Sequence, residues 1–499
     1  MEFSKKSQVF ETLISAIFLL ELLRPNVAEF RAVGLATSTI TFRALNCRKH
    51  SAVLTDFGGI GDGKTSNTKA FEAAIMNLSQ VAPDGGAQLI VPPGKWLTGS
   101  FNLTSHFTLF VHKDAVILGS QDESEWPPVA LLPSYGRGRD APSGRLSSLI
   151  FGTNLTDVVI TGNPNTHLAS QAFNQVGGLS IWLVIQGNNG TIDGQGSYWW
   201  KLFRDNKMTV TRPYMIEIMY SKQVQISNLT LVNSPSWNVH PIYSSDIIIQ
   251  HLTVFAPVDS PNTDGIDPDS CTNTRIEDSF IVSGDDCIAV KSGWDEYGIK
   301  FNMPTKQLVI RRFACISPSS ATIALGSEMS GGIEDVRVED VTAINTESGV
   351  RIKTGVGRGA YVKDVYVRNM TLNTMKYVFW MTGDYGSHPD AEFDQNAFPV
   401  IKGINYRDIV ADNVTQSAQL DGIGKHPFTD ICISNVNIKL AAKPKGVQWN
   451  CSDVQGVTNR VSPEPCNLLP RKEIDCPFAK DRLPIEDVQL KTCSISGNF

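Results

Sequence analysis

Seven short segments in the middle of the chain share one pattern, in which apolar and polar residues alternate along a β-branched strand. The third residues of these segments are Ile226, Ile249, Ile276, Ile310, Val338, Val367 and Ile433, spaced by 23, 27, 34, 28, 29 and 66 positions. A period in the twenties predicts a parallel β-helix, in which each coil buries its apolar face only by stacking on its neighbours. The wide last gap leaves room for more than one coil. A β-propeller needs a longer period, and the leucine pattern of a leucine-rich solenoid is absent.

A second short segment follows several of these strands at a similar phase. The segments are NTDGIDPDS (262–270), SGDDCIAVKS (283–292), SSATIALGSE (319–328) and GVRIKT (349–354). Equivalent residues on stacked coils lie about 4.8 Å apart, so stacking predicts that Asp264 lies beside Asp285 and Asp286. Arg351 and Lys353, two apart on one strand, share a face two coils further on. The sequence therefore predicts three carboxyl groups beside two cations on one outer wall.

Such a group of residues has a definite chemistry. Clustered carboxylates repel one another, so at least one keeps its proton to higher pH while another stays ionised. An acid and a base side by side are what glycoside hydrolysis requires. An adjacent Arg and Lys pair can bind a negatively charged sugar. Taken singly, GDD is also typical of a turn or a calcium loop, and RIK of a solvated strand edge.

The stretch GGIGDGKT, residues 58–65, fits the phosphate-binding loop of nucleotide-binding proteins. A plausible strand precedes it, and SNTKAFEAAIMNL after it predicts a helix capped by Ser66 or Asn67. The alternative is a glycine-rich turn that simply starts this helix. In a parallel β-helix such a helix would cap the end of the core.

The N-terminus has two lysines ahead of a short apolar run, which predicts a signal peptide or signal anchor over residues 1–28. Eight Asn-x-Ser/Thr sequons agree with secretion, and they begin at Asn77, Asn102, Asn154, Asn189, Asn228, Asn369, Asn413 and Asn450. Nine cysteines, five of them after residue 430, predict disulfides around a C-terminal segment and leave one thiol over. We therefore expect a secreted protein of the extracellular region or cell wall.

The rest of the chain shows no linker or charge block that would divide it into domains. We expect one catalytic β-helix domain over residues 45–480 and a C-terminal tail over 481–499. The net charge of −6 gives no basic face for nucleic acid. We expect no nucleic-acid or nucleotide partner, no cofactor, no metal, and a monomer.

In several sequence motifs the chain resembles the plant polygalacturonases of glycoside hydrolase family 28. The resemblance runs from about Ala52 to beyond Cys476, through DFGGIGDGKTSNTKAF, GTIDGQGSYWW, SPSWNVHP, NTDGIDPDS, SGDDCIAVKSG and RIKT. It implies a right-handed parallel β-helix of the pectin-lyase-like type that cleaves α-1,4 bonds of polygalacturonate, a pectic polysaccharide, by inversion, without metal or nucleotide.

The resemblance also implies roles for individual residues. Asp285 is the general acid, and Asp264 and Asp286 activate the water. Arg351, Lys353 and Asn262 bind the substrate. Cys287 and Cys315 resemble a pair that the family joins by a disulfide beside the active site.

The sequence departs from the family in two places. The family usually has a Gly-His-Gly motif where this chain has Ser320, Ala321 and Thr322. His240 could replace the missing histidine, although a lone histidine on a strand is more often structural. Residues 163–187 interrupt a stretch that otherwise reads as continuous, and we expect this insert to bulge from its coil or to disturb it.

Three functions follow from these observations. The first is a secreted pectin hydrolase. The second is a polysaccharide-binding β-helix that has lost turnover, and the third is a hydrolase of a related acidic polymer such as rhamnogalacturonan. Endo and exo attack both remain open.

Overall fold

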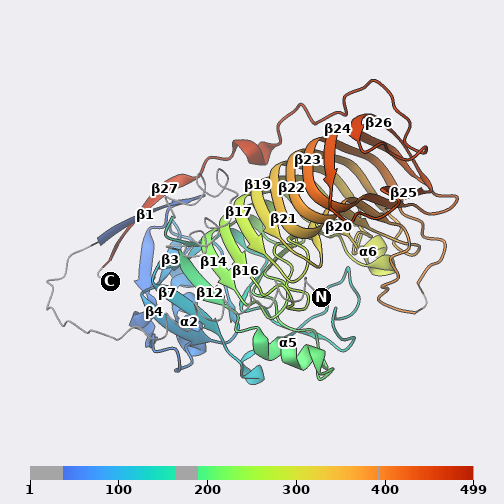
Figure 1. The fold of residues 1–499 in the computed structure, drawn as a ribbon. Helices are drawn as coiled ribbons and strands as arrows, with labels where there is room; N and C mark the ends of the chain where they lie inside the picture. Colours follow the sequence, from blue (N-terminus) through green and yellow to red (C-terminus); the bar gives the residue numbers. More distant parts are fainter. Residues whose placement is uncertain (1–37, 165–188, 392, 498–499) are drawn as a thin grey trace. The chain divides into compact units, whose positions relative to one another are not determined.

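The computed structural model describes residues 38–164, 189–391 and 393–497. It contains a compact unit, Ile40–Ile495, and a small unit of Met1–Thr39 with Ser496–Phe499 that lies almost entirely outside the described residues. The large unit is a stack of parallel strands whose coils follow one another along the sequence, as the colours of Figure 1 show. The predicted signal segment, 1–28, lies outside the described residues.

Most of the regular structure is strand. The strands are β1 (Ser38–Ala44), β2 (His50–Val53), β3 (Ala87–Val91), β4 (Gly94–Thr98), β5 (Phe101–Asn102), β6 (Phe107–Val111), β7 (Ala115–Gly119), β8 (Pro128–Val129), β9 (Arg145–Leu146), β10 (Ile150–Thr153), β11 (Thr156–Gly162), β12 (Gly190–Asp193), β13 (Ile216–Met219), β14 (Lys222–Val232), β15 (Val239–Ile242), β16 (Ser245–Phe255), β17 (Thr272–Val282), β18 (Ile288–Val290), β19 (Thr305–Ile316), β20 (Ala321–Gly326), β21 (Ile333–Lys353), β22 (Tyr361–Thr382), β23 (Val400–Asp421), β24 (Phe428–Leu440), β25 (Trp449–Ser452), β26 (Val454–Ser462) and β27 (Lys491–Gly497). The helices are η1 (Leu54–Phe57), α2 (Thr68–Val81), η2 (Glu123–Glu125), α5 (Ser197–Arg204), α6 (Asp295–Phe301) and η3 (Pro484–Asp487).

The predicted repeat residues stack in register. Successive partners in this row are Ile226, Ile249, Ile276, Ile310, Val338 and Val367. Tyr406 of β23 then stands between Val367 and Ile433, so the wide gap in the sequence pattern holds two coil steps. All of these side chains are buried in one continuous core. The prediction of a parallel β-helix is confirmed.

A residue with positive φ bends each of these strands two positions after the stacked residue. These corner residues are Asn228, His251, Asp278, Arg312, Asp340, Asn369, Asp408 and Asn435. Asn and Asp predominate because they enter the left-handed region at least cost among residues with a side chain. Neighbouring corners also bond to each other: Asn369 Nδ2 donates to Asp340 at 2.5 Å, and Asn435 Nδ2 donates to Asp408 at 2.6 Å. Asn and Asp in these strands therefore mark coil corners.

The helix α2 covers the N-terminal end of the stack, next to β2 and β3. Asn67 is its N-cap residue, one of the two that the sequence offered. The buried face of α2 includes Phe71, whose ring stacks on Phe101 with the centroids 4.3 Å apart. This packing closes the open end of the apolar core, and without it the first coil would expose its interior.

The glycine-rich stretch before α2 is a turn closed by its own acid. Asp62 accepts hydrogen bonds from the backbone N–H groups of Lys64 and Thr65, each at 2.8 Å, and from the Thr65 hydroxyl. In a phosphate-binding loop such N–H groups would face the phosphate. Here the chain's own carboxylate takes that place, which favours the reading of a helix-starting turn.

The predicted insert at 163–187 falls almost wholly on residues outside the described ranges, but the strands on either side of it are clear. Before the insert, Ile160 of β11 pairs with Ile226. After it, Ile192 of β12 pairs with Leu231. Since Ile226 and Leu231 belong to the same strand, β14, the coil keeps its register across the insert. The extra residues therefore enter at the corner of one coil.

Four disulfides join the cysteines as Cys47–Cys493, Cys287–Cys315, Cys432–Cys476 and Cys451–Cys466. The structure thus forms the Cys287–Cys315 bond that the resemblance implies. Two pairs hold the C-terminal region as expected, whereas Cys493 reaches back to the N-terminal Cys47. The odd thiol is Cys271, which is buried.

The expected C-terminal tail, 481–499, packs on the β-helix as far as the compact unit extends. Leu483 and Ile485 are buried against Ile248 and Val309. Their apolar side chains explain why this segment is held, and the backbone oxygen of Ile485 accepts a hydrogen bond from Arg275 at 2.7 Å. Among the described residues, no helix is both long and apolar enough to cross a membrane.

Candidate active site

Three carboxyl groups meet on the wall of the β-helix formed by the second strands of successive coils. Ile266 bridges to Ile288 in parallel register, which places Asp264 next to Asp286, two residues earlier in each segment. One oxygen of each of Asp264, Asp285 and Asp286 lies within 4.8 Å of the others. The predicted stacking of the NTD and GDD segments therefore brings these three acids together.

Asp286 is buried and fully bonded. Its Oδ2 lies 2.5 Å from the Lys353 ammonium. Its Oδ1 accepts hydrogen bonds from the Ser320 hydroxyl at 2.6 Å and from the backbone N–H of Ala321 at 3.0 Å. Lys353, expected to bind substrate, is thus paired with an acid of the site.

Asp285 is the only one of the three acids that is partly exposed. Its Oδ1 lies 2.9 Å from the Ser320 hydroxyl, and its Oδ2 lies 3.4 Å from Asn262 Nδ2. Asn262 Oδ1 in turn accepts a hydrogen bond from buried Arg212 at 2.9 Å. Asn262, predicted as a substrate-binding residue, therefore orients Asp285 in this structure.

The two buried acids have opposite proton affinities. Burial and the charge of Asp285 raise the pKa of Asp264 to about 8. Burial also raises the pKa of Asp286, but the Lys353 ammonium outweighs it, and the pKa of Asp286 falls below its usual value. A protonated carboxyl group and an ionised carboxylate thus stand side by side in the neutral range.

Lys291 also belongs to the site, although its sequence motif did not single it out. Its ammonium lies 3.3 Å from Glu328, 3.6 Å from Asp267 and 3.8 Å from Asp264. It also lies 4.5 Å from the ring centroid of Trp237. A signal was present in the spacing, because the register of the strands puts Lys291 and Lys353 at equivalent positions two coils apart.

Asp267 is a second residue of the site that the sequence analysis missed. It is fully buried, and neither of its carboxyl oxygens has a hydrogen-bond partner within the described ranges. Burial and the neighbouring Asp264 raise its pKa well above the usual value. Because Asp267 and Asp264 both hold their protons in the neutral range, the charge of Lys291 is balanced by Glu328.

Arg351 lies further along the same wall. Its guanidinium stacks over the ring of Trp380 at 3.4 Å, and its Nη1 lies 3.8 Å from Glu347. Its Nε atom has no partner among the described residues. Arg351 is thus held by an aromatic ring and a carboxylate 3.8 Å away, whereas Lys353 pairs directly with Asp286.

Comparison with known proteins decides the family. A family model described as "Glycosyl hydrolases family 28" matches residues 150–462. The chain belongs to this family. A "Probable polygalacturonase" of Vitis vinifera is 60% identical over 496 residues, which cover 99% of this chain and 95% of that relative.

Among solved structures, an exopolygalacturonase from Thermotoga maritima is 23% identical with a TM-score of 0.66, covering 87% of this chain and 94% of that one. A family 28 exopolygalacturonase from Yersinia enterocolitica is 20% identical with a TM-score of 0.64, covering 86% and 79%. At these identities the two structures support the fold.

Within family 28, this chain lacks the usual Gly-His-Gly histidine, and His240 does not take its place. His240 is fully buried, with Nδ1 3.0 Å from Glu217 and Nε2 3.4 Å from Asp269. Burial lowers its pKa, but these two carboxylates outweigh burial and raise it. Both ring nitrogens are thus occupied by acids outside the cluster of three, which supports the structural reading of His240.

Ser320 fills the position of the missing motif and contacts both acids of the GDD segment. We expect Ser320→Ala to lower kcat/KM by roughly tenfold, because the hydrogen bond to a charged group is worth about 1.5 kcal/mol or more. The acid limb of the pH profile should move to higher pH, since Asp286 loses a donor that favours its ionised form.

Ser319→Ala is the matched control for this experiment. Ser319 is exposed, and its hydroxyl donates to the backbone oxygen of Gly284 at 3.1 Å. We expect this variant to behave as the wild type and Ser320→Thr to recover most activity. An unchanged pH profile in Ser320→Ala would show that Ser320 does not tune Asp286.

Proposed function

We propose that this protein hydrolyses α-1,4 glycosidic bonds in polygalacturonate. The observation that carries the proposal is the pairing of a protonated acid, Asp264, with an ionised one, Asp286, beside Asp285, which is partly exposed. General acid and base groups in contact are what cleavage of a glycosidic bond by water requires. The name of the Vitis vinifera relative supports the choice of polymer.

The roles follow from exposure and charge. Asp285 is the acid that protonates the leaving oxygen, because it alone of the three reaches the surface. Asp286, kept ionised by Lys353, is the base that activates water. Asp264 holds the proton that the cluster retains. It passes this proton to Asp285, which donates it to the leaving oxygen, and Asp264 then joins Asp286 in holding the water.

Arg351 binds the carboxylate of a substrate sugar, and Trp380 beneath it holds the guanidinium in place. Lys353 does not contact the substrate carboxylate directly. It contributes to substrate binding only through its positive charge beside Asp286. The cluster carries little uncompensated negative charge, because Lys353 pairs with Asp286 and Asp264 holds its proton.

The close spacing of the three acids does not itself indicate the stereochemical course. Inverting enzymes commonly separate their two carboxyl groups by roughly 6.5–9.5 Å, while the nearest oxygens here lie within 4.8 Å. Inversion rests on the resemblance to family 28, and NMR of the first-formed anomer tests it directly.

Reducing-end release from polygalacturonate by the purified protein tests the proposed function. We expect release without ultraviolet absorbance, since hydrolysis forms no double bond. Binding without release would favour a non-catalytic polysaccharide-binding protein. Release from rhamnogalacturonan alone would move the substrate to that polymer, and product profiles on defined oligogalacturonides would separate endo from exo attack.

The proposed setting is the plant cell wall. Four disulfides suit a secreted protein, because they form and persist in an oxidising environment. Mass analysis of the mature N-terminus after expression in plant cells would show whether residues 1–28 are removed.

A further inference from the structure

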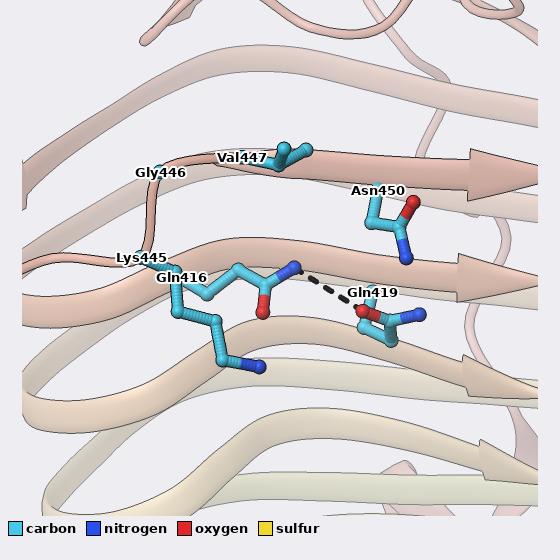
Figure 2. Close-up of a pocket in the computed structure, with 6 residues that line it drawn as sticks. All are labelled: Gln416, Gln419, Lys445, Gly446, Val447 and Asn450. Atoms are coloured by element: carbon cyan, nitrogen blue, oxygen red, sulfur yellow. Dashed lines mark hydrogen bonds between the residues drawn. The ribbon is translucent and has the colours of Figure 1, made fainter.

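A pocket lined mainly by residues with polar side chains lies on the same wall as the candidate active site, toward the C-terminal end of the β-helix. Its volume is about 350 Å³, and its lining residues are Gln416, Gln419, Lys445, Gly446, Val447 and Asn450. Figure 2 shows that Gln416 and Gln419 come from one coil, and that Lys445 and Asn450 flank them from the next. The pocket is therefore built between two successive coils.

The pocket is aligned with the substrate-binding arginine. Arg351 pairs with Trp380, Trp380 with Gln419, and Gln419 with Asn450, so these residues form one straight row. From the coil of Asp286 to the coil of Gln419 there are four strand steps. At about 4.8 Å a step, the pocket lies roughly 19 Å from the acids along the wall.

The space between the acids and the pocket is lined by aromatic rings. Trp380 and Tyr377 lie with their centroids 4.6 Å apart, and Lys445 Nζ lies 3.4 Å from the Tyr377 hydroxyl. Aromatic rings beside polar groups suit a sugar chain, which presents apolar faces and polar edges. The wall thus offers a continuous surface from Arg351 to Lys445.

The chemistry of the pocket specifies what it accepts. Gln416 is only 2% exposed, and its Oε1 has no hydrogen-bond partner in the part of the chain that the structure describes. Its Nε2 is already engaged by Ala418 O and by Gln419 Oε1. A buried acceptor without a partner is costly, so a ligand hydroxyl that donates to Oε1 would stabilise the site. Lys445 adds a cation at the rim.

The loop that carries Lys445 forms the rim of the pocket, and hydrogen bonds within the protein hold it in place. The backbone N–H of Lys445 donates to Thr415 O at 2.9 Å, and Gln448 Nε2 donates to Lys445 O at 2.6 Å. Gln448 Oε1 accepts hydrogen bonds from the N–H and the hydroxyl of Ser417. Little ordering is therefore required of this loop on binding.

We propose that this pocket is a distal subsite for one uronic acid residue of the polysaccharide chain that occupies the active site. Lys445 pairs with the sugar carboxylate, and Gln416 Oε1 accepts a hydrogen bond from a sugar hydroxyl. This inference rests on the proposed function for the chain that passes the acids. It adds a length requirement, because only a chain that spans about 19 Å reaches both places.

Lys445→Ala tests the subsite, with Lys443→Ala as the matched control. Lys443 is an exposed lysine of the same loop that does not line the pocket. We expect Lys445→Ala to lower kcat/KM on polygalacturonate about three- to tenfold at low salt, between the values for an exposed ion pair and for a hydrogen bond to a charged group. Turnover of a trigalacturonide and of fully methyl-esterified pectin should not change. An equal loss on the trimer, or no loss on the polymer, would overturn the proposal.

A binding measurement separates this proposal from the proposed function. In an Asp285→Asn background, which removes turnover, we expect Lys445→Ala but not Lys443→Ala to weaken binding of polygalacturonate by the same three- to tenfold factor. Gln416→Leu, which removes the unpartnered acceptor, should also weaken it. Unchanged affinity in both variants would contradict the subsite even if the protein hydrolyses the polymer. Intact mass should be recorded first, because Asn450 begins a sequon and a glycan there would fill the pocket mouth.

Discussion

Asp285→Asn is expected to lower kcat on polygalacturonate by about 10²- to 10⁴-fold, the range for loss of a general acid. Asparagine keeps the shape of the side chain and can still accept the hydrogen bonds that Asp285 Oδ1 receives from Ser320 and from the Asp286 N–H. It cannot protonate the leaving oxygen at any useful pH. Affinity for the polymer should remain within a few-fold of the wild type, since the change removes a proton donor and leaves Arg351 intact.

The prediction for kcat and affinity is checked by measuring initial rates and equilibrium binding on the same preparation. Asp259→Asn is the control, because Asp259 is an exposed acid whose carboxylate lies 3.5 Å from Arg204. A residual rate of Asp285→Asn within tenfold of the wild type would assign the proton donor to another residue. Asp264, with its raised pKa, would then be the candidate.

Lys353→Met is expected to lower kcat/KM by roughly 10²-fold and to shift its pH dependence. Lys353 offsets the effect of burial on Asp286, so without Lys353 burial raises the pKa of Asp286. Asp286 acts as a base in its ionised form, and a higher pKa moves the acid limb of the profile to higher pH. The rate should therefore recover partly as the pH rises.

A comparison of two polymers distinguishes an action of Lys353 through Asp286 from direct binding of the substrate carboxylate. If Lys353 acts through Asp286, the loss should be similar on polygalacturonate and on methyl-esterified pectin. A loss confined to the charged polymer, with an unchanged pH profile, would restore Lys353 to the role of a carboxylate clamp. Removing one partner of a buried ion pair costs about 3–5 kcal/mol of stability, so thermal melting and the variant Lys353→Arg belong to the experiment.

The fold was predictable because the β-helix repeats a local rule. Positions such as Ile226 and Ile249 recur at a spacing that only stacking explains, and that stacking alone brings Asp264 to Asp286. The helix α2 was predictable from its own periodicity and cap. These features depend on order along the chain, which a sequence displays directly.

The residues that the sequence analysis missed owe their importance to contacts between coils, which a local sequence pattern does not show. Lys291 and Asp267 lie on strands already recognised, but their importance comes from burial beside Asp264, which no local pattern reports. The pairing of Lys353 with Asp286 likewise needs the length and direction of a side chain across two coils. The packing of Leu483 under the sheet could not be predicted, because two apolar residues in a short tail carry no period.

The disulfide between Cys47 and Cys493 joins two residues that are 446 positions apart in the sequence. Almost the whole β-helix therefore lies within one covalent ring. A solenoid held only by contacts between neighbouring coils can peel from either end, one coil at a time. Here neither end is loose, since the first coil and the last segment are fastened to each other. A protease that cuts one surface loop would therefore open the ring without releasing a fragment, and the nicked enzyme should stay in one piece until a reductant is added.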